Sequence, residues 1–156
     1  MTSIEDRILI EDTHYRYSSS IDSANVDRLS EVLHPDIWAR FGNADPIQGE
    51  RKLTTWIREA TARCVWQHHL LNVYHADVRG DSATALVYHT SYQKFSGDDG
   101  VCLLVGRYHN ELTKHEGTWK ISRLVLEVMW GERRTDTAGY LESVGGRGPE
   151  VLGWPS

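Results

Sequence analysis

The sequence has only two cysteines, Cys64 and Cys102, among its 156 residues, and neither belongs to a CxxC pair. So few unpaired cysteines argue against a disulfide-stabilised scaffold and against a zinc site built from thiolates. Two free, mostly buried thiols are the simplest interpretation.

Long apolar runs are also missing, since no stretch approaches the roughly 18 residues that a membrane-spanning helix needs. The N-terminal segment MTSIEDRILIEDTHYRY mixes acidic with apolar residues, where a signal or transit peptide would begin with a basic patch. With 40% hydrophobic and 25% charged residues, the composition is that of a globular protein. The sequence therefore predicts a cytoplasmic protein that does not bind membranes.

Positive charge is sparse as well. The chain has 17 Lys and Arg against 22 Asp and Glu, and no run of Lys or Arg is longer than the pair Arg133–Arg134. Such a balance gives little electrostatic support for a nucleic-acid partner. The length fits one domain rather than two.

The three aromatic residue types occur in uneven numbers. Six Trp and seven Tyr accompany only two Phe, and there are eight His. Trp and Tyr combine a large apolar body with one polar group, and they often line wet cavities or interfaces. The composition suggests a ligand pocket.

The order of the predicted elements indicates an α+β fold. The apolar spacing predicts helices at 3–19, 24–33 and 50–63, a short strand at 37–41 and four long strands at 65–78, 82–95, 101–114 and 118–130. Ser3 and Asp6 form a capping box for the first helix, where Ile4, Ile8, Leu9, Tyr15 and Tyr17 recur near helical spacing. We expect three N-terminal helices packed on a curved, mainly antiparallel sheet that encloses a pocket. Residues 1–132 would form this domain, with the glycine-rich residues 133–156 as its tail or lid.

Motifs for metal or nucleophilic chemistry are absent from the sequence, which has neither HExxH nor GxSxG. A metal site would need ligands from several strands, so we expect none. The remaining chemistry is acid/base work by a histidine controlled by a carboxylate.

The first long strand carries adjacent histidines that alternate between its faces. His68 is the candidate base, because its face mixes apolar bulk with polar tips, namely Trp66, Leu70, Asn72 and Tyr74. The outward face would then carry Gln67, His69, Leu71 and Val73, which could contact a partner subunit. Asp22, in the turn between two helices, is the candidate carboxylate. Alternatively, Asp22 is an N-cap of the second helix and His68 a core histidine.

The segments SIDSANVDRL, WQHHLLN, GRYHNEL, HEGTWKISRL and VMWGE resemble the SnoaL-like superfamily over about residues 4–132. Within it the nearest likenesses are to scytalone dehydratase and hexachlorocyclohexane dehydrochlorinase. The resemblance implies a cone-shaped α+β barrel. It also implies that Asp22 pairs with His68, which would remove a proton from a substrate carbon.

Departures from those two enzymes bear on the substrate. Ile21 and Phe41 stand where scytalone dehydratase has two water-holding tyrosines, and Tyr17 stands where the dehydrochlorinase has a lysine. The resemblance implies that His89 is the counterpart of a second histidine. Arg107 could bind an oxygen in the cavity, or lie outside in an ion pair. The predicted substrate-binding residues are thus Tyr17, Phe41, Trp66, Asn72, His89 and Arg107, and the predicted catalytic residues are Asp22 and His68.

These observations and the resemblance together predict a lyase that needs no cofactor. It would act as a dehydratase or dehydrohalogenase on a small hydrophobic ring substrate, oxygenated or halogenated, and it would form a homodimer or homotrimer. A polyketide cyclase, a double-bond isomerase and a non-catalytic ligand-binding module are the alternatives.

Overall fold

A computed structural model describes residues 3–135, which form two α-helices, one 3-10 helix and six strands. In chain order these are α1 (Ile4–Asp22), η1 (Val26–Glu31), β1 (Leu33–Phe41), β2 (Ile47–Gln48), α2 (Glu50–Thr61), β3 (Cys64–Arg79), β4 (Ser82–Phe95), β5 (Val101–His115) and β6 (Thr118–Arg134).

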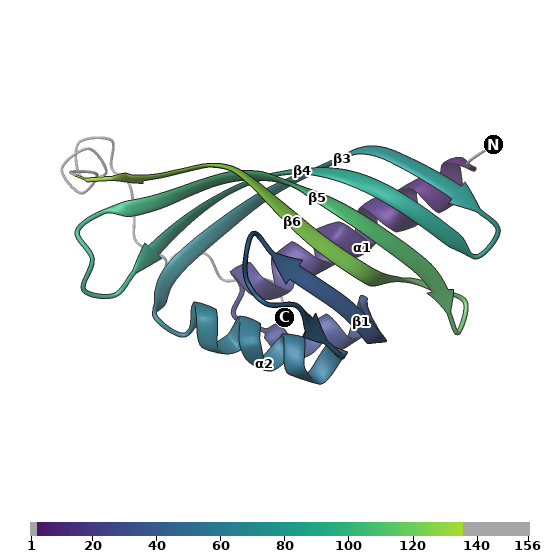
Figure 1. Cartoon of the computed structure of the whole chain (residues 1–156), viewed down its shortest axis with the longest axis horizontal. Helices are drawn as coiled ribbons and strands as arrows, with labels where there is room; N and C mark the ends of the chain where they lie inside the picture. Colours follow the sequence, from purple (N-terminus) through teal and green to yellow (C-terminus); the bar gives the residue numbers. More distant parts are fainter. Residues whose placement is uncertain (1–2, 136–156) are drawn as a thin grey trace.

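The six strands form one curved sheet in the order β2-β1-β6-β5-β4-β3 (Figure 1). All pairs are antiparallel except β1 with β6, which is parallel. The sheet is not closed into a barrel, because β2 and β3 remain at its two edges. The predicted α+β class and the mainly antiparallel sheet are confirmed.

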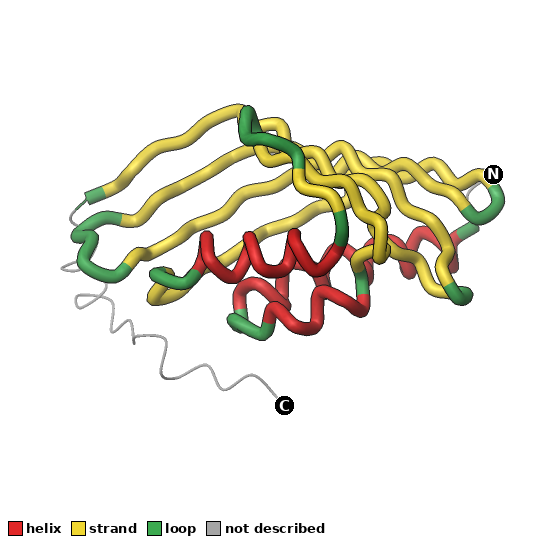
Figure 2. The backbone as a smooth tube through the Cα atoms, turned by 60° about the horizontal axis from the view of Figure 1, so that its bottom comes forward, coloured by secondary structure: helices red, strands yellow, loops and turns green. Residues whose placement is uncertain are grey.

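Both α-helices lie on the same side of the sheet, so they and the sheet form two layers (Figure 2). The predicted N-cap of α1 is confirmed, since the Ser3 hydroxyl accepts a hydrogen bond from the Asp6 backbone amide at 2.9 Å. The stripe that α1 buries differs from the predicted one, because Ile4 and Ile8 are exposed. Ile10, Thr13, His14, Tyr17, Ser18, Ser20 and Ile21 are the buried residues.

The second predicted helix is shorter than expected, and the strand after it is longer. The second helix, η1, is a 3-10 helix that ends at Glu31. Strand β1 begins already at Leu33, before Pro35. Strand pairing explains the early start, because the Ile121 amide of β6 donates to the Val32 carbonyl at 2.8 Å. At the other end, β6 continues to Arg134, two residues past the predicted domain boundary. The rest of the predicted tail lies outside the described residues.

A β-bulge near the middle of β3 decides which side chains reach the helices. Val73 pairs with Val87 of β4, but His75 already pairs with Leu86, so Tyr74 is an extra residue in the ladder. Such a residue shifts the alternation of side chains by one position.

The effect on the two histidines is direct. The β3–β4 hairpin pairs Arg79 with Ser82, and an uninterrupted ladder from that turn would direct His68 toward the helices. On the N-terminal side of the bulge, the side chains directed toward the helices are instead those of Gln67, His69, Leu71 and Val73. The predicted assignment of faces is therefore wrong for this half of β3.

Packing between β5 and β6 depends on a glycine at Gly106. A Cβ at this position would lie 2.5 Å from the Glu127 carbonyl oxygen and 3.1 Å from Leu126 Cδ1. We therefore expect Gly106→Ala to lower the free energy of unfolding by about 1–3 kcal/mol, because backbone must move to accept the methyl group. Chemical denaturation measures the loss. Gly131→Ala is the matched control, since the nearest atom to its Cβ would be 3.9 Å away; equal stabilities of the two variants would contradict this account.

The outer face of the sheet is open to solvent and partly apolar. Tyr74 and Tyr88 stack there with ring centroids 4.9 Å apart, and Leu70 is 55% exposed. The outer face also carries an ion cluster of Arg107, His109 and Glu127. The predicted homo-oligomer stays a prediction. None of the described helices is both long and apolar enough to cross a membrane.

Candidate active site

A carboxylate and a histidine meet where the end of α1 packs on β3. His69 Nδ1 lies 2.5 Å from Asp22 Oδ1, and the His69 backbone amide donates to Asp22 Oδ2 at 2.9 Å. Both side chains are nearly buried, with 10% of His69 and 13% of Asp22 exposed. Asp22 thus holds His69 at two points, which fixes the position of the imidazole.

The pairing also fixes the tautomer of His69. An ionised carboxylate only accepts hydrogen bonds, so the proton of a neutral imidazole lies on Nδ1 and the lone pair on Nε2. Asp22 is the last residue of α1, where a negative charge opposes the helix dipole. It is not an N-cap, because Asn25 holds that position for η1. Helix stability therefore does not explain why an aspartate occupies position 22, whereas the pairing with His69 does.

Two glutamines connect the same end of α1 to the sheet. Gln67 Nε2 donates to the Ile21 carbonyl at 2.7 Å, and Gln93 Nε2 donates to Gln67 Oε1 at 3.3 Å. The residue before Asp22 is thereby attached to β3 and, through Gln67, to β4. These bonds hold the carboxylate in register with His69.

A cavity of about 370 Å³ opens beside this pair, between the sheet and the two α-helices. None of the residues that line it is a lysine, arginine, aspartate or glutamate. The lining residues are Tyr17, Ile21, Phe41, Ala44, Trp56, Ile57, Ala60, Thr61, His69, His89, Ser91, Gln93, Leu104, Tyr108, Leu126 and Val128. A cavity of this size and composition fits a small, uncharged and largely apolar molecule.

His89 of β4 is a second histidine in the cavity wall. Its ring centroid lies 5.4 Å from that of His69, and the residue is 3% exposed. Burial, reinforced by the neighbouring His69, lowers the pKa of His89 from 6.5 to about 4, so it is neutral at physiological pH. Its Nδ1 is buried without a hydrogen-bond partner among the described residues.

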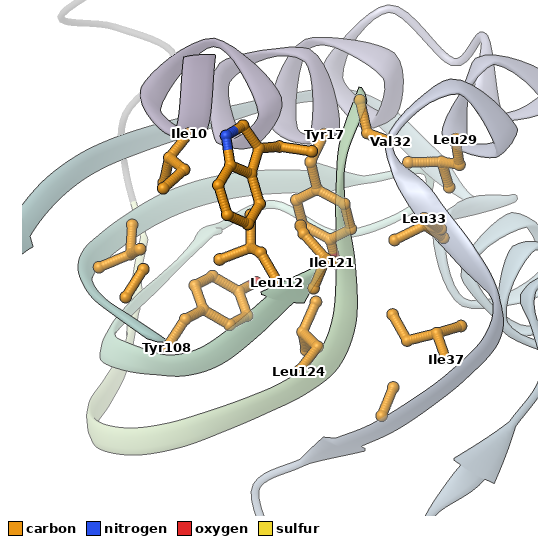
Figure 3. Close-up of a cluster of buried hydrophobic side chains, with 14 of the residues drawn as sticks. Ile10, Tyr17, Leu29, Val32, Leu33, Ile37, Tyr108, Leu112, Ile121 and Leu124 are labelled. Carbon is orange, nitrogen blue, oxygen red and sulfur yellow. The ribbon is translucent and has the colours of Figure 1, made fainter. Parts of the chain in front are cut away.

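Two tyrosines line the inner, buried end of the cavity. Both also belong to the cluster of buried hydrophobic side chains (Figure 3). Tyr17 of α1 meets Tyr108 of β5 edge to face, with ring centroids 6.2 Å apart. Burial raises the pKa of each phenol well above its usual value, so both stay protonated. Tyr108 also contacts His89, with ring centroids 5.2 Å apart.

An aromatic pair forms another part of the cavity wall. Phe41 of β1 stacks on Trp56 of α2, with ring centroids 4.7 Å apart and an angle of 19° between the planes. Trp56 is 37% exposed, so this stack lies nearer to solvent than the tyrosines. It offers a flat apolar surface to a ring.

Comparison with known proteins identifies the family. The profile of the SnoaL-like domain matches residues 2–125. The chain belongs to the SnoaL-like family. An uncharacterised protein of Mycobacterium tuberculosis is 28% identical over 127 residues, which cover 80% of this chain and 86% of that protein.

Solved structures share the SnoaL-like fold at low sequence identity. A proposed scytalone dehydratase from Novosphingobium aromaticivorans superposes with a TM-score of 0.78 at 16% identity, covering 86% of this chain and 91% of the other. A type 2 hexachlorocyclohexane dehydrochlorinase superposes with a TM-score of 0.79 at 14% identity, covering 96% and 97%. The predicted family and its cone-type fold are confirmed, and at these identities the structures show the fold alone.

In this SnoaL-like chain, four of the eight predicted site residues lie together around the cavity. Asp22 contacts His69, and the cavity is lined by Tyr17, Phe41 and His89. A role for these residues in substrate binding stays a prediction.

The other four predicted site residues lie on the outer face. His68 is exposed and does not pair with Asp22, so the predicted partner is wrong. Trp66 and Asn72 share its face for the same reason, the bulge at Tyr74. Arg107 Nε donates to Glu127 Oε2 at 3.1 Å, which is the alternative that the sequence left open for it.

The site residues that the sequence analysis missed are His69, Ser91, Gln93 and Tyr108. One signal was available in β4, where small apolar residues at Ala83, Ala85 and Val87 are followed at the same spacing by His89, Ser91 and Gln93. A change from apolar to polar along one strand face indicates that this face leaves the core and enters a cavity. Within residues 3–135, no three His, Cys, Asp or Glu side chains cluster as metal ligands would.

Proposed function

We propose that this protein is an enzyme that removes a proton from a substrate carbon with His69 as the base and Asp22 as its partner, without a cofactor. The observation that carries the proposal is the double contact of Asp22 with His69 at the wall of an uncharged cavity. A binding module would have no use for a buried ionisable pair, whose desolvation is costly.

The chemistry follows from the tautomer. The lone pair of His69 Nε2 takes the proton from carbon, and the Asp22 carboxylate stabilises the imidazolium that forms. In an elimination, the electrons of the broken C–H bond form a double bond while a hydroxyl group leaves. The leaving oxygen takes the proton from the imidazolium, so the products are an alkene and water and His69 is neutral again.

The residues that line the cavity indicate the class of substrate. An uncharged ring compound can stack on Phe41 and Trp56 and direct an oxygen toward His89. Oxygenated substrates are favoured over halogenated ones, because none of the lining residues carries a positive side chain that would stabilise a departing halide. Dehydration is the preferred reaction. Isomerisation or cyclisation would use the same first step on a substrate that lacks a leaving group.

Exchange of carbon-bound hydrogen tests the first step without knowledge of the product. Small cyclic ketones and hydroxyketones are incubated with the protein in D2O, and deuterium incorporation is followed by NMR. We expect catalysed exchange for at least one ring compound with wild-type protein and its loss with His69→Gln. Ligands that bind in the cavity but exchange no faster than in buffer would contradict the proposal and indicate a binding module.

A further inference from the structure

Two phenol groups line the inner end of the cavity. Their rings contribute to packing, but packing does not need their hydroxyl groups. Tyr17 is 3% exposed and Tyr108 is 4% exposed, and their rings meet edge to face. Burial of two hydroxyl groups is costly unless each makes a hydrogen bond. The pair has two hydroxyl protons, and a hydrogen bond between the tyrosines can use only one of them.

In such a pair the second proton belongs to the tyrosine that accepts the bond. Tyr17 comes from α1, and Tyr108 lies between it and the histidines, in contact with His89. When Tyr17 donates to Tyr108, the hydroxyl proton of Tyr108 remains for a molecule in the cavity. A hydroxyl that accepts one hydrogen bond also becomes a better donor of its own, because hydrogen bonds in a chain polarise one another.

The base and this donor lie along one row of contacts in the cavity. His69 contacts His89 at 5.4 Å between ring centroids, and His89 contacts Tyr108 at 5.2 Å. Gly106 pairs with His89 on the neighbouring strand, so no side chain from that position fills the space beside the imidazole. A ring in the cavity can therefore present a C–H group to His69 and an oxygen to Tyr108.

We propose that Tyr108, supported by Tyr17, donates a hydrogen bond to a carbonyl oxygen of the substrate and stabilises the enolate that forms when His69 removes the neighbouring proton. This inference rests on the proposed function and narrows the substrate class to uncharged carbonyl compounds. Tyr108 is the catalytic donor, and Tyr17 is a positioning residue.

The electron balance needs no further reactant. His69 Nε2 gains the proton, the C–H electron pair becomes the carbon–carbon double bond of the enolate, and the carbonyl π pair moves to the oxygen that Tyr108 faces. Neutral hydroxyl donors in a water-poor cavity are suited to this charge, because they are oriented before the reaction begins. The raised pKa of Tyr108 keeps its proton in place through the working pH range.

Phenols test the donor directly, since a phenolate is a flat, delocalised oxyanion like an enolate. The probe is 4-nitrophenol, whose absorbance reports its ionisation. With wild-type protein we expect the bound probe to ionise about one pH unit lower than the free probe, which is a roughly tenfold preference for the phenolate. Tyr108→Phe should remove this preference, and Tyr17→Phe should reduce it by about threefold. Tyr15→Phe is the matched control on α1, because Tyr15 is 46% exposed.

The possible results separate the donor from the base. An unchanged phenolate preference in Tyr108→Phe would overturn the inference, as would a preference lost only in His69→Gln. If Tyr108→Phe removes the preference while no ketone undergoes exchange, the role of Tyr108 as a donor is supported and the proposed proton abstraction is refuted. If exchange depends on His69 but proceeds at the wild-type rate in Tyr108→Phe, the proposed proton abstraction is supported and the role of Tyr108 as a donor is refuted. Thermal unfolding of each variant verifies that the fold is kept.

Discussion

His69→Gln and Asp22→Asn are each expected to lower the rate of proton abstraction by about 10³-fold, whereas His68→Gln leaves it unchanged. A positioned general base typically contributes 10² to 10⁴-fold to a rate, which sets the scale for His69. Asp22→Asn has a similar effect for another reason. An amide can donate to Nδ1, which would place the imidazole proton on Nε2 and leave the ring unable to accept a proton there.

The two histidines make this a sharply controlled experiment. They are adjacent in sequence and identical in chemistry, but His69 is nearly buried against Asp22 and His68 is exposed on the opposite face. Rates are measured as deuterium exchange at saturating ketone, and retention of ligand affinity shows that the cavity is intact. A large loss in His68→Gln together with wild-type exchange in His69→Gln would refute the site described above.

Acid should destabilise the fold strongly between pH 6.5 and pH 4, by about 6 kcal/mol in total, through two buried histidines. Burial lowers the pKa of His14 from 6.5 to about 4, and burial also lowers the pKa of His89 to about 4. The unfolded chain takes up protons on both residues below pH 6.5, while the folded chain does not until about pH 4. Each histidine then costs about 3 kcal/mol of unfolding free energy, since one pH unit corresponds to about 1.4 kcal/mol.

The direction of this effect follows from the depressed pKa values. Above pH 6.5 both histidines are neutral in the folded and unfolded states, so they do not make stability depend on pH. The contribution of the two histidines to stability falls as the pH decreases through the window and levels off below pH 4. Urea unfolding at intervals of half a pH unit measures the slope.

A substitution at His14 isolates its share of the acid sensitivity. The Nδ1–H of His14 donates to the Ile10 carbonyl at 2.7 Å, and its Nε2 accepts from Asn110 Nδ2 at 3.0 Å. His14→Gln keeps an acceptor for Asn110 and removes the titrating ring, so the slope between pH 6.5 and 4 should fall by about half. His75→Gln, at an exposed position, should leave the slope unchanged. Equal slopes for wild type and His14→Gln would show that His14 does not set the acid sensitivity.

Much of the fold could be predicted from the sequence because the signals were local. The hairpin turns at 79–82 and 115–118 and the long strands beside them were located within a few residues, since turn chemistry and β-branched runs act over short distances. The N-cap at Ser3 was correct for the same reason. The buried stripe of α1 was not, because it follows Ile10, His14 and Tyr17, and only the sheet beneath decides which helix face is covered.

The same distinction applies to the site. The sequence by itself determined the residue types, the SnoaL-like resemblance, the strand that carries the histidine and the position of Asp22, all of which are encoded in short segments. Only the tertiary structure decided between His68 and His69. Both faces of β3 mix apolar and polar residues, so the hydrophobic pattern does not specify which face turns inward. One extra residue at Tyr74 shifted the alternation, and that bulge is a property of the pairing between two strands, which neither strand encodes alone.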